Sequence, residues 1–234
     1  MRHALHPLHP LHALALLASA ALAIASAPWA LDRPWLNVAF KPLATVLIIA
    51  YAWRRGRATP AARRWVLAGL LLSLAGDVAL LWPQRGFLPG LVSFLLAHLA
   101  YLMAFTRVQP LAARRWPFAA YATLAAVVLA GLWPGVPAAL RAPVLAYVAC
   151  LAAMAAQAAV VWRAGAAPAT DAAAAAGRRL ALGGALFLLS DALLATNRFA
   201  APLPLASLWI LASYWAAQWC IASWLAPPAS EEGN

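Results

Sequence analysis

The chain has 234 residues, of which 66% are hydrophobic and only 10% charged, and its mean hydropathy is +0.80. A water-soluble domain of this size could not cover so much apolar surface, so the composition excludes a soluble fold and indicates an integral membrane protein. The formal net charge is +11, but the basic residues occur in short segments between apolar runs rather than in a stripe beside aromatic residues. This placement argues against nucleic acid as a partner.

The apolar runs predict an all-α fold, a polytopic transmembrane helix bundle. A span needs about 20 predominantly apolar residues, so the chain has room for about eight spans but not for a separate soluble domain. We therefore predict one integral membrane domain over residues 1–234. In chain order, the predicted spans are residues 11–27, 35–53, 65–82, 87–105, 116–133, 143–162, 180–196 and 205–225. Tryptophans, which favour the headgroup zone, lie near many of the predicted span ends.

The first segment has two interpretations. Residues 1–27 have a basic start, an apolar stretch and an Ala25-Ser26-Ala27 ending, which together resemble a signal peptide. Pro28 directly follows the candidate cleavage site and disfavours cleavage there. We therefore expect this segment to be retained as the first span.

No metal site, cofactor or disulfide is expected. The N-terminal histidines recur at every third position: His3, His6, His9 and His12. Pro7 and Pro10 interrupt the regular helix that would align these side chains as ligands. Cys150 and Cys220 fall in apolar runs far apart in sequence, which is typical of packing residues. The alanine-rich segment 164–176 is interpreted as a low-complexity linker.

The arginines are distributed unequally between alternate loops. One set of loops carries most of them: Arg54, Arg55, Arg57, Arg63, Arg64, Arg107, Arg114, Arg115, Arg163, Arg178 and Arg179. The other set carries only Arg33, Arg85, Arg141 and Arg198. The positive-inside rule makes the first set cytoplasmic, which puts both termini in the cytoplasm and requires an even number of spans. The high alanine and arginine content favours a GC-rich bacterial source, so we expect a multi-pass protein of the cell membrane, the bacterial inner membrane.

Few charged residues remain inside the predicted spans. They are Lys41, Asp77 and Asp191, with His98 near a span centre. A charge at the centre of a membrane helix costs roughly 2.5 to 3.5 kcal/mol on insertion scales, so such residues usually face a bundle interior and mark function. The alternative is an interhelical ion pair that only fixes packing, but one lysine cannot neutralise two carboxylates.

Helical spacing places these residues on polar stripes. The stripes are Asn37, Lys41 and Thr45; Ser73 and Asp77; Phe94, His98, Tyr101 and Phe105; Phe187, Asp191, Leu194 and Arg198; Tyr214 and Gln218. Steps of three and four put each set on one helix face. Counted from the span ends, Lys41 and both aspartates lie in the outer half of the membrane, with His98, Tyr214 and Gln218 near its middle. We expect one polar cavity to contain them.

A weak internal repeat aligns the two aspartates. Residues 69–80 (GLLLSLAGDVAL) overlay residues 183–194 (GGALFLLSDALL), with Asp77 opposite Asp191. This alignment suggests two parallel four-span repeats whose interface brings the carboxylates together.

The same segments carry a resemblance to a known family, the YhhN-like lysoplasmalogenases, over nearly the whole chain. The matching residues are Phe40-Lys41-Pro42-Leu43, Ser73-Leu74-Ala75-Gly76-Asp77, Gly90-Leu91-Val92-Ser93-Phe94, Ala97-His98, Tyr101, Ser190-Asp191-Ala192-Leu193-Leu194-Ala195, Asn197-Arg198-Phe199, Tyr214, Ala217 and Gln218. The resemblance implies hydrolysis of the vinyl ether bond of lysoplasmalogens, with a lysophospholipid substrate drawn from membrane lipid. The products would be a fatty aldehyde and a glycerophospho-ethanolamine or -choline.

This chemistry needs a proton for the alkene carbon and a base for water, and two carboxylates could share that work. Asp77 and Asp191 are therefore the expected catalytic pair, and the sequence leaves open which is the acid. A supporting set is expected to bind the phosphate or to position water and leaving group: Lys41, Ser73, Arg85, His98, Tyr101, Ser190, Asn197, Arg198, Tyr214 and Gln218. Within that set, Lys41 is expected to tune the carboxylates, and Arg85 and Arg198 to bind phosphate.

Two other functions remain open from the sequence. Paired intramembrane carboxylates in repeated halves are also typical of proton-coupled transporters, which would use Asp77 and Asp191 to carry protons. A lipid-binding or assembly protein would use its polar core only to fix helix packing. Aldehyde release from lysoplasmalogen without a gradient would favour the enzyme.

Overall fold

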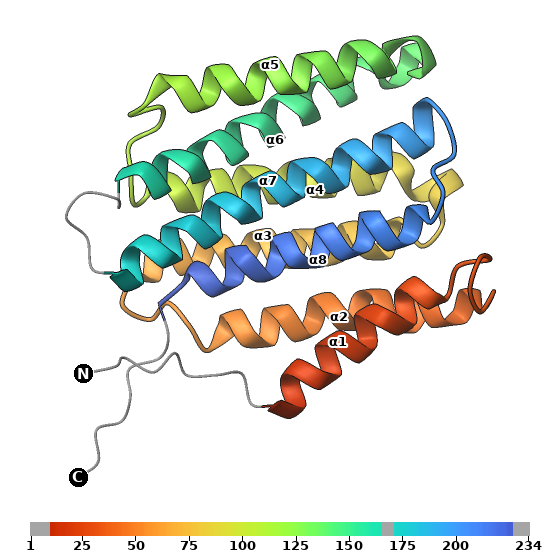
Figure 1. The fold of residues 1–234 in the computed structure, drawn as a ribbon, viewed down its shortest axis with the longest axis horizontal. Helices are drawn as coiled ribbons and strands as arrows, with labels where there is room; N and C mark the ends of the chain where they lie inside the picture. The colour runs from red at the N-terminus through yellow and green to blue at the C-terminus, as the bar shows by residue number, and fades with distance from the viewer. Residues whose placement is uncertain (1–9, 165–170, 227–234) are drawn as a thin grey trace.

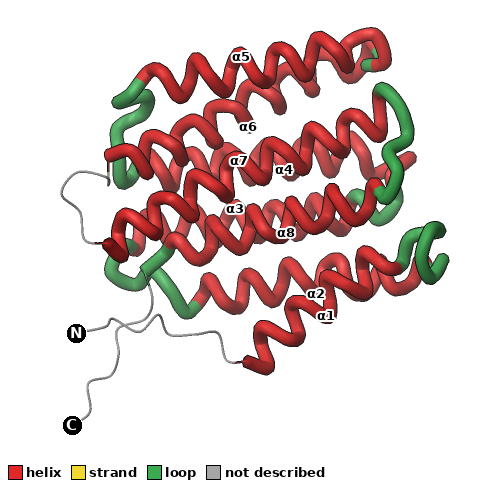
Figure 2. Tube along the Cα trace, viewed as in Figure 1, coloured by secondary structure: helices red, strands yellow, loops and turns green. Residues whose placement is uncertain are grey.

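The computed structural model describes residues 10–164 and 171–226, and these residues form an all-α bundle without strands (Figures 1 and 2). The elements are α1 (Pro10–Ala25), α2 (Pro34–Trp53), α3 (Pro60–Ala79), α4 (Pro83–Thr106), α5 (Arg115–Leu132), the short 3-10 helix η1 (Trp133–Gly135), α6 (Ala138–Ala164), α7 (Asp171–Phe199) and α8 (Ala206–Trp224). The predicted all-α helix bundle is confirmed.

Several helices begin earlier than the apolar runs predict. The helices α1 to α4 each begin at a proline, whose fixed φ angle suits the first turn of a helix. The helix α6 begins at Ala138 instead of residue 143, and α7 begins at Asp171 instead of residue 180. The prediction of a linker over 164–176 is therefore wrong from residue 171 onward. The alanine run there forms the first turns of α7, because alanine has a high helix propensity. His3, His6 and His9 lie outside the described residues.

Among the described residues, five helical segments are long and apolar enough to cross a membrane, judged by length and composition: Pro34–Trp53, Gln84–Thr106, Arg115–Gly135, Ala138–Ala164 and Asp171–Phe199. The helix α1 is apolar but shorter. The helix α3 carries three charged residues and α8 carries Gln218 with many tryptophans and serines. Both pack along a candidate span, α3 on α4 and α8 on α7. The helix α1 likewise packs along α2. For α1, α3 and α8 the prediction of a membrane span therefore rests on packing against a candidate span.

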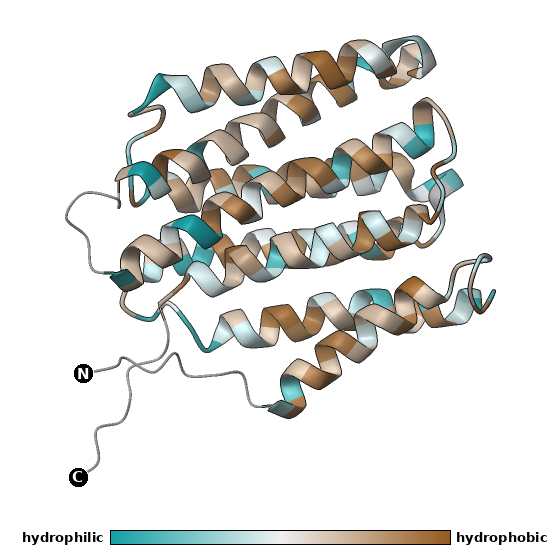
Figure 3. Cartoon of the chain, viewed as in Figure 1, coloured by the Kyte–Doolittle hydropathy of each residue, from teal (hydrophilic) through white to brown (hydrophobic). Residues whose placement is uncertain are grey.

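The surface of the bundle suits a lipid environment. Large apolar side chains face outward, and Val127 on α5, for example, is 66% exposed. Tryptophans near helix ends are also exposed, as at Trp35, Trp53, Trp82 and Trp116. Amphipathic rings in such positions favour the membrane interface. In Figure 3 hydrophobic residues dominate the middle of the outer helices.

The helices form two halves, α1–α4 and α5–α8, that pack against each other. The helix α5 lies at one edge of the bundle, and α1 and α2 lie at the opposite edge (Figure 1). The antiparallel pairs α3–α4 and α7–α8 have the most extensive contacts. The helix α2 packs on α3 of its own half and on α8 of the other half, while α6 packs on α7 and on α4. The two halves therefore contact each other through equivalent helices, which is the pattern expected of two repeats of four helices.

Two glycines of α3 allow α4 to approach closely. A Cβ atom at Gly76 would lie 2.6 Å from the ring of Phe94, and a Cβ atom at Gly69 would overlap the ring of Tyr101. Because those rings occupy the space of a side chain, only glycine fits at these two positions. The glycine next to Asp77 thus fixes an aromatic ring beside the carboxylate.

Candidate active site

The first polar cluster surrounds Asp77, which is 1% exposed. Thr45 Oγ1 on α2 donates to Asp77 Oδ2 at 2.6 Å, and Tyr214 OH on α8 donates to the same oxygen at 2.8 Å. Lys41 Nζ, one turn before Thr45, lies 3.7 Å from Asp77 Oδ1. Residues from two other helices, α2 and α8, therefore hold this carboxylate of α3, and a lysine supplies its counter-charge.

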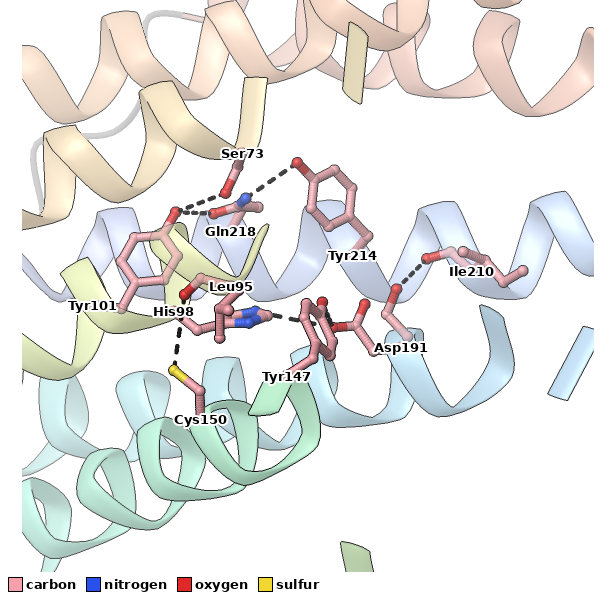
Figure 4. Close-up of polar contacts among 11 residues, drawn as sticks. Ser73, Leu95, His98, Tyr101, Tyr147, Cys150, Asp191, Ile210, Tyr214 and Gln218 are labelled. Carbon is pink, nitrogen blue, oxygen red and sulfur yellow. Dashed lines mark hydrogen bonds and ion pairs between the residues drawn. The ribbon is translucent and has the colours of Figure 1, made fainter. Parts of the chain in front are cut away.

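Hydrogen bonds extend from this cluster deeper into the bundle (Figure 4). Gln218 Nε2 donates to Tyr214 OH at 3.2 Å, and Gln218 Oε1 accepts from Tyr101 OH at 2.5 Å. Ser73 Oγ lies 3.5 Å from Tyr101 OH. Because a fully connected buried network rigidifies its members, this chain fixes the orientation of Tyr214 toward Asp77.

The second cluster surrounds Asp191 on α7. Tyr147 OH on α6 donates to Asp191 Oδ2 at 2.5 Å. His98 Nε2 on α4 lies 3.9 Å from the same oxygen, which is too far for a hydrogen bond. The His98 ring is fully buried against Tyr147 and Phe187, and neither ring nitrogen has a hydrogen-bond partner among the described residues. An unsatisfied buried polar group next to a carboxylate is unusual and marks a functional candidate.

The two clusters follow the same plan. Asp77 is contacted by the helix before it, through Thr45 on α2, and by the last helix of the other half, through Tyr214 on α8. Asp191 is contacted by the helix before it, through Tyr147 on α6, and by the last helix of the other half, through His98 on α4. The predicted repeat therefore coincides with a repeated arrangement of side chains around the carboxyl groups.

Both carboxyl groups line one cavity of about 700 Å³. Seven of the predicted site residues line it: Lys41, Asp77, Ser190, Asp191, Asn197, Arg198 and Tyr214. The loop after α1 and the start of α8 form its rim, where Trp29 Nε1 donates to Ser207 Oγ at 3.0 Å. A cavity of this volume is in the usual range for small-molecule sites. We call it the polar cavity.

The remaining predicted residues lie elsewhere. Ser73, His98, Tyr101 and Gln218 are fully buried and do not line the cavity. The expectation that His98 and Gln218 would line the same cavity is therefore wrong, because their side chains are enclosed by neighbouring helices. Arg85 is exposed in the first turn of α4 and also lies outside the cavity lining.

The residues at the end of α7 shape the cavity mouth. Ser190 Oγ donates to the carbonyl of Ile210 at 3.0 Å, which ties α7 to α8 beside Asp191. Asn197 Oδ1 accepts from the backbone N–H of Leu203 at 2.9 Å and holds the connection between these helices. The Arg198 guanidinium lies 5.0 Å from the centre of the Phe87 ring. Arg198 is exposed, so its charge is available to an anionic group at the mouth.

A second, narrow cleft lies between α4, α5, α6 and α7. Apart from Asp191 and Tyr147, its lining is apolar, with Ala125 and Val128 from α5, Leu151 from α6 and other residues from these helices. Asp191 lines both the cleft and the polar cavity. We call this space the apolar cleft.

Two residues in direct contact with the carboxyl groups, Thr45 and Tyr147, are not among the site residues predicted from the sequence. Thr45 lies on the predicted stripe with Lys41 but was not placed in the site, and Tyr147 was missed. The signal for Tyr147 is a hydroxyl group inside a predicted span, because buried tyrosine hydroxyls usually find a partner. The sequence could not name that partner, which lies 44 residues away on another helix.

No group of three histidine, cysteine, aspartate or glutamate side chains is arranged to hold a metal ion within residues 10–164 and 171–226. The described His12 has a backbone partner, since its Nε2 lies 3.0 Å from the carbonyl oxygen of Leu47. The site therefore offers carboxyl, hydroxyl, amide and cationic groups, which are suited to moving protons and orienting water.

The chain is similar to several known membrane proteins. The YhhN family model matches residues 36–225. Lysoplasmalogenase TMEM86A of Homo sapiens is 35% identical over 168 residues, which are 70% of this chain and 66% of that protein. Lysoplasmalogenase TMEM86B of Sus scrofa is 34% identical over 195 residues, 80% of this chain and 74% of that protein. The uncharacterized membrane protein YhhN of Escherichia coli O157:H7 is 34% identical over 100 residues, 42% of this chain and 47% of its own length. No solved structure matches this chain.

Proposed function

Because the chain belongs to the YhhN family, we propose that it is a membrane-embedded lysoplasmalogenase that hydrolyses the vinyl ether bond of lysoplasmalogens. Relatives that carry this name are 31 to 36% identical over most of the chain. The observation that carries the proposal is the pair of carboxyl groups, Asp77 and Asp191, lining one cavity inside a membrane bundle. The substrate, a lysophospholipid, would reach this cavity from the membrane.

The reaction needs two proton transfers that such a pair supplies. A carboxylic acid donates a proton to the alkene carbon distal to the ether oxygen, and the other alkene carbon becomes part of an oxocarbenium ion. Water attacks that carbon while the second carboxylate accepts a proton from it, which gives a hemiacetal. The hemiacetal carbon–oxygen bond to the glycerol then breaks as the hemiacetal hydroxyl loses a proton and the leaving oxygen takes one up. A fatty aldehyde and a glycerophospho-ethanolamine or -choline are released.

The depth of each cationic residue in the cavity determines its proposed supporting role. Lys41 lies within 4 Å of Asp77 and deep in the bundle, so it stabilises that carboxylate rather than binding a lipid phosphate. Arg198 lies at the mouth, where a charged headgroup remains hydrated, and binds the phosphate. Arg85 lies outside the cavity lining, so Arg198 is the stronger candidate of the two.

The location follows from charge asymmetry. In Figure 1 the start of α1 and the end of α8 lie at the same end of the bundle as the α2–α3 and α4–α5 connections, the end of α6 and the start of α7. Most of the arginines lie at this end, in these connections or in the ends of the helices beside them: Arg54, Arg55, Arg57, Arg63, Arg64, Arg107, Arg114, Arg115, Arg163, Arg178 and Arg179. By the positive-inside rule we place this end in the cytoplasm of a bacterial cell, in the inner membrane. The polar cavity then opens on the opposite, outer side.

The decisive experiment is incubation of purified protein with a 1-alkenyl lysophospholipid while aldehyde release is measured. The matched control is the 1-alkyl analogue, which has the same headgroup and chain but no double bond. We expect aldehyde from the alkenyl lipid only. No aldehyde, together with proton-coupled lipid uptake into vesicles that contain the protein, would support the transporter function instead, for which the repeated halves are the favouring observation.

A further inference from the structure

The apolar cleft has the shape and chemistry of a hydrocarbon site. Along α7 its lining runs from Leu188 to Phe199, a rise of about 16 Å at 1.5 Å per residue. On α5 the lining residue farthest from the cavity end of the bundle is Ala125, and on α6 it is Leu151. The cleft is therefore elongated along the helices, with an apolar inner end that contains no polar partner for a headgroup.

The cleft and the polar cavity meet at a shared set of residues. Both spaces are lined by Leu80, Phe87, Phe94, Asp191 and Leu194. Phe94 is fixed at this junction by its close contact with Gly76 and by an edge-to-face contact with Tyr214, whose ring centroid is 5.7 Å away. Asp191 is the charged residue of the junction, whereas Asp77 lines only the polar cavity.

A single-chain lipid has a polar end and an apolar end joined at the reacting bond. On the basis of the proposed function, we propose that the apolar cleft holds the alkenyl chain of the lysophospholipid and that Asp191 donates the proton to the alkene. A headgroup in the polar cavity and a chain in the cleft place the vinyl ether at the junction, beside Asp191. Burial of the chain in the cleft removes apolar surface from water and provides binding energy.

The surroundings of the two carboxyl groups support this division of roles. Asp77 has a counter-charge in Lys41 and accepts hydrogen bonds from Thr45 and Tyr214, an environment that favours a carboxylate. In the described part of the chain no lysine or arginine lies within ion-pair distance of Asp191, whose hydrogen-bond partner is the neutral Tyr147 hydroxyl. Asp191 thus serves as the proton-bearing acid and Asp77 as the base that activates water.

The proton and electron balance is complete with these two groups and one water. The alkene π electrons form a C–H bond with the Asp191 proton, and the ether oxygen stabilises the resulting cation. The water oxygen forms a bond to the cationic carbon, and Asp77 takes its proton. On collapse of the hemiacetal the leaving oxygen takes up a proton and the hemiacetal hydroxyl loses one, which leaves the aldehyde. The net change is consumption of one water.

The proposed site of the alkenyl chain is tested by shortening the apolar cleft at its inner end. Ala125 on α5 is buried and lines the cleft, whereas its neighbour Ala126 is exposed on the outer face. Ala125→Phe fills the inner end, and Ala126→Phe adds the same ring on the lipid side. We expect Ala125→Phe to lower kcat/KM for a long-chain substrate by about fourfold for each methylene that it displaces. A short-chain analogue should be hydrolysed at the wild-type rate by both variants.

A second pair covers the case in which Ala125→Phe does not fold. Val128→Trp narrows the cleft from the same helix, and Val127→Trp, on the exposed face, is its control. An unchanged ratio of long-chain to short-chain kcat/KM in a folded cleft variant would overturn the assignment of the cleft to the alkenyl chain. The proposed function would still stand. A wild-type protein that releases no aldehyde from either substrate would overturn both.

The acid assignment is tested by rescue with azide, a nucleophile that needs no deprotonation. In Asp77→Ala the acid is still present, so azide can capture the oxocarbenium ion. We expect azide to raise the rate of vinyl ether consumption by this variant at least tenfold. In Asp191→Ala the cation does not form, and azide should have no effect. Asp77→Asn and Asp191→Asn provide a second pair if the alanine variants do not fold. Rescue of the Asp191 variants and not of the Asp77 variants would reverse the assignment.

Discussion

The Tyr147 hydroxyl provides a sharp test of the site, because it was identified from the structure and contacts Asp191 directly. Its OH donates to Asp191 Oδ2 at 2.5 Å, while its ring packs on His98 with centroids 5.2 Å apart. Tyr147→Phe removes the hydroxyl and keeps the ring. A hydrogen bond to a group that carries or develops charge contributes about 1.5 to 3 kcal/mol. If the bond orients the acid in the transition state, kcat should fall roughly 10- to 150-fold.

The assay is aldehyde release from a 1-alkenyl lysophospholipid at saturating concentration, with thermal unfolding in detergent as a parallel measurement. Tyr121→Phe is the matched control, because Tyr121 is a half-buried tyrosine on α5 that does not line either space. We expect KM to change little, since the variant keeps the ring that lines the apolar cleft and the removed hydroxyl contacts Asp191 rather than the headgroup. A Tyr147→Phe protein with wild-type kcat would refute the positioning of Asp191 by this hydroxyl, and a large fall in unfolding temperature with unchanged kcat would assign Tyr147 a structural role.

Further predictions concern the two carboxyl groups, their counter-charge, the membrane topology and the end of α8. Asp77→Asn and Asp191→Asn should each abolish turnover in protein that still inserts and folds, as measured by aldehyde release and size-exclusion chromatography; wild-type activity would exclude a catalytic role. Lys41→Met should lower kcat more than it raises KM. It should also destabilise the fold by about 3 to 5 kcal/mol, because it leaves a buried carboxylate unpaired. The double variant Lys41→Met with Asp77→Asn should regain thermal stability. A cysteine introduced into the C-terminal tail should resist an impermeant thiol reagent added outside intact cells, and labelling would place the tail outside. Arg55 is buried and donates to two carbonyl groups at the end of α8, so Arg55→Met should lower the unfolding temperature in detergent, while Arg54→Met, at an exposed neighbour, should not.

The fold class and the carboxyl pair could be predicted because membrane insertion constrains the sequence strongly. Long apolar runs have few alternatives to helices in lipid, and a charge in such a run needs a strong reason to persist. Asp77 and Asp191 therefore stood out without any structural information. Their repeated sequence context also predicted two related halves, and the packing of α2 on α8 and of α6 on α4 follows that pattern.

The partners of these groups could not be predicted in the same way. A helical stripe gives the face of a residue but not the helix that this face meets, so the contact of Tyr147 with Asp191 was missed. Depth along a span is also a poor guide to cavity lining. His98 and Gln218 lie on predicted polar faces, yet neighbouring side chains enclose them completely. Arg85 was expected to act with Arg198, but only Arg198 lines the cavity.

The repeated architecture raises the question of how two carboxyl groups in similar positions take different roles. In each half the aspartate meets a hydroxyl from the preceding helix, Thr45 for Asp77 and Tyr147 for Asp191. The difference lies in what each half adds to this common plan. The first half adds Lys41, whose ammonium lies 3.7 Å from Asp77, and the second half adds the apolar cleft beside Asp191. A counter-charge favours a base, and an apolar neighbour favours contact with the substrate chain, so the proposed roles of Asp191 as acid and Asp77 as base rest on these departures from symmetry.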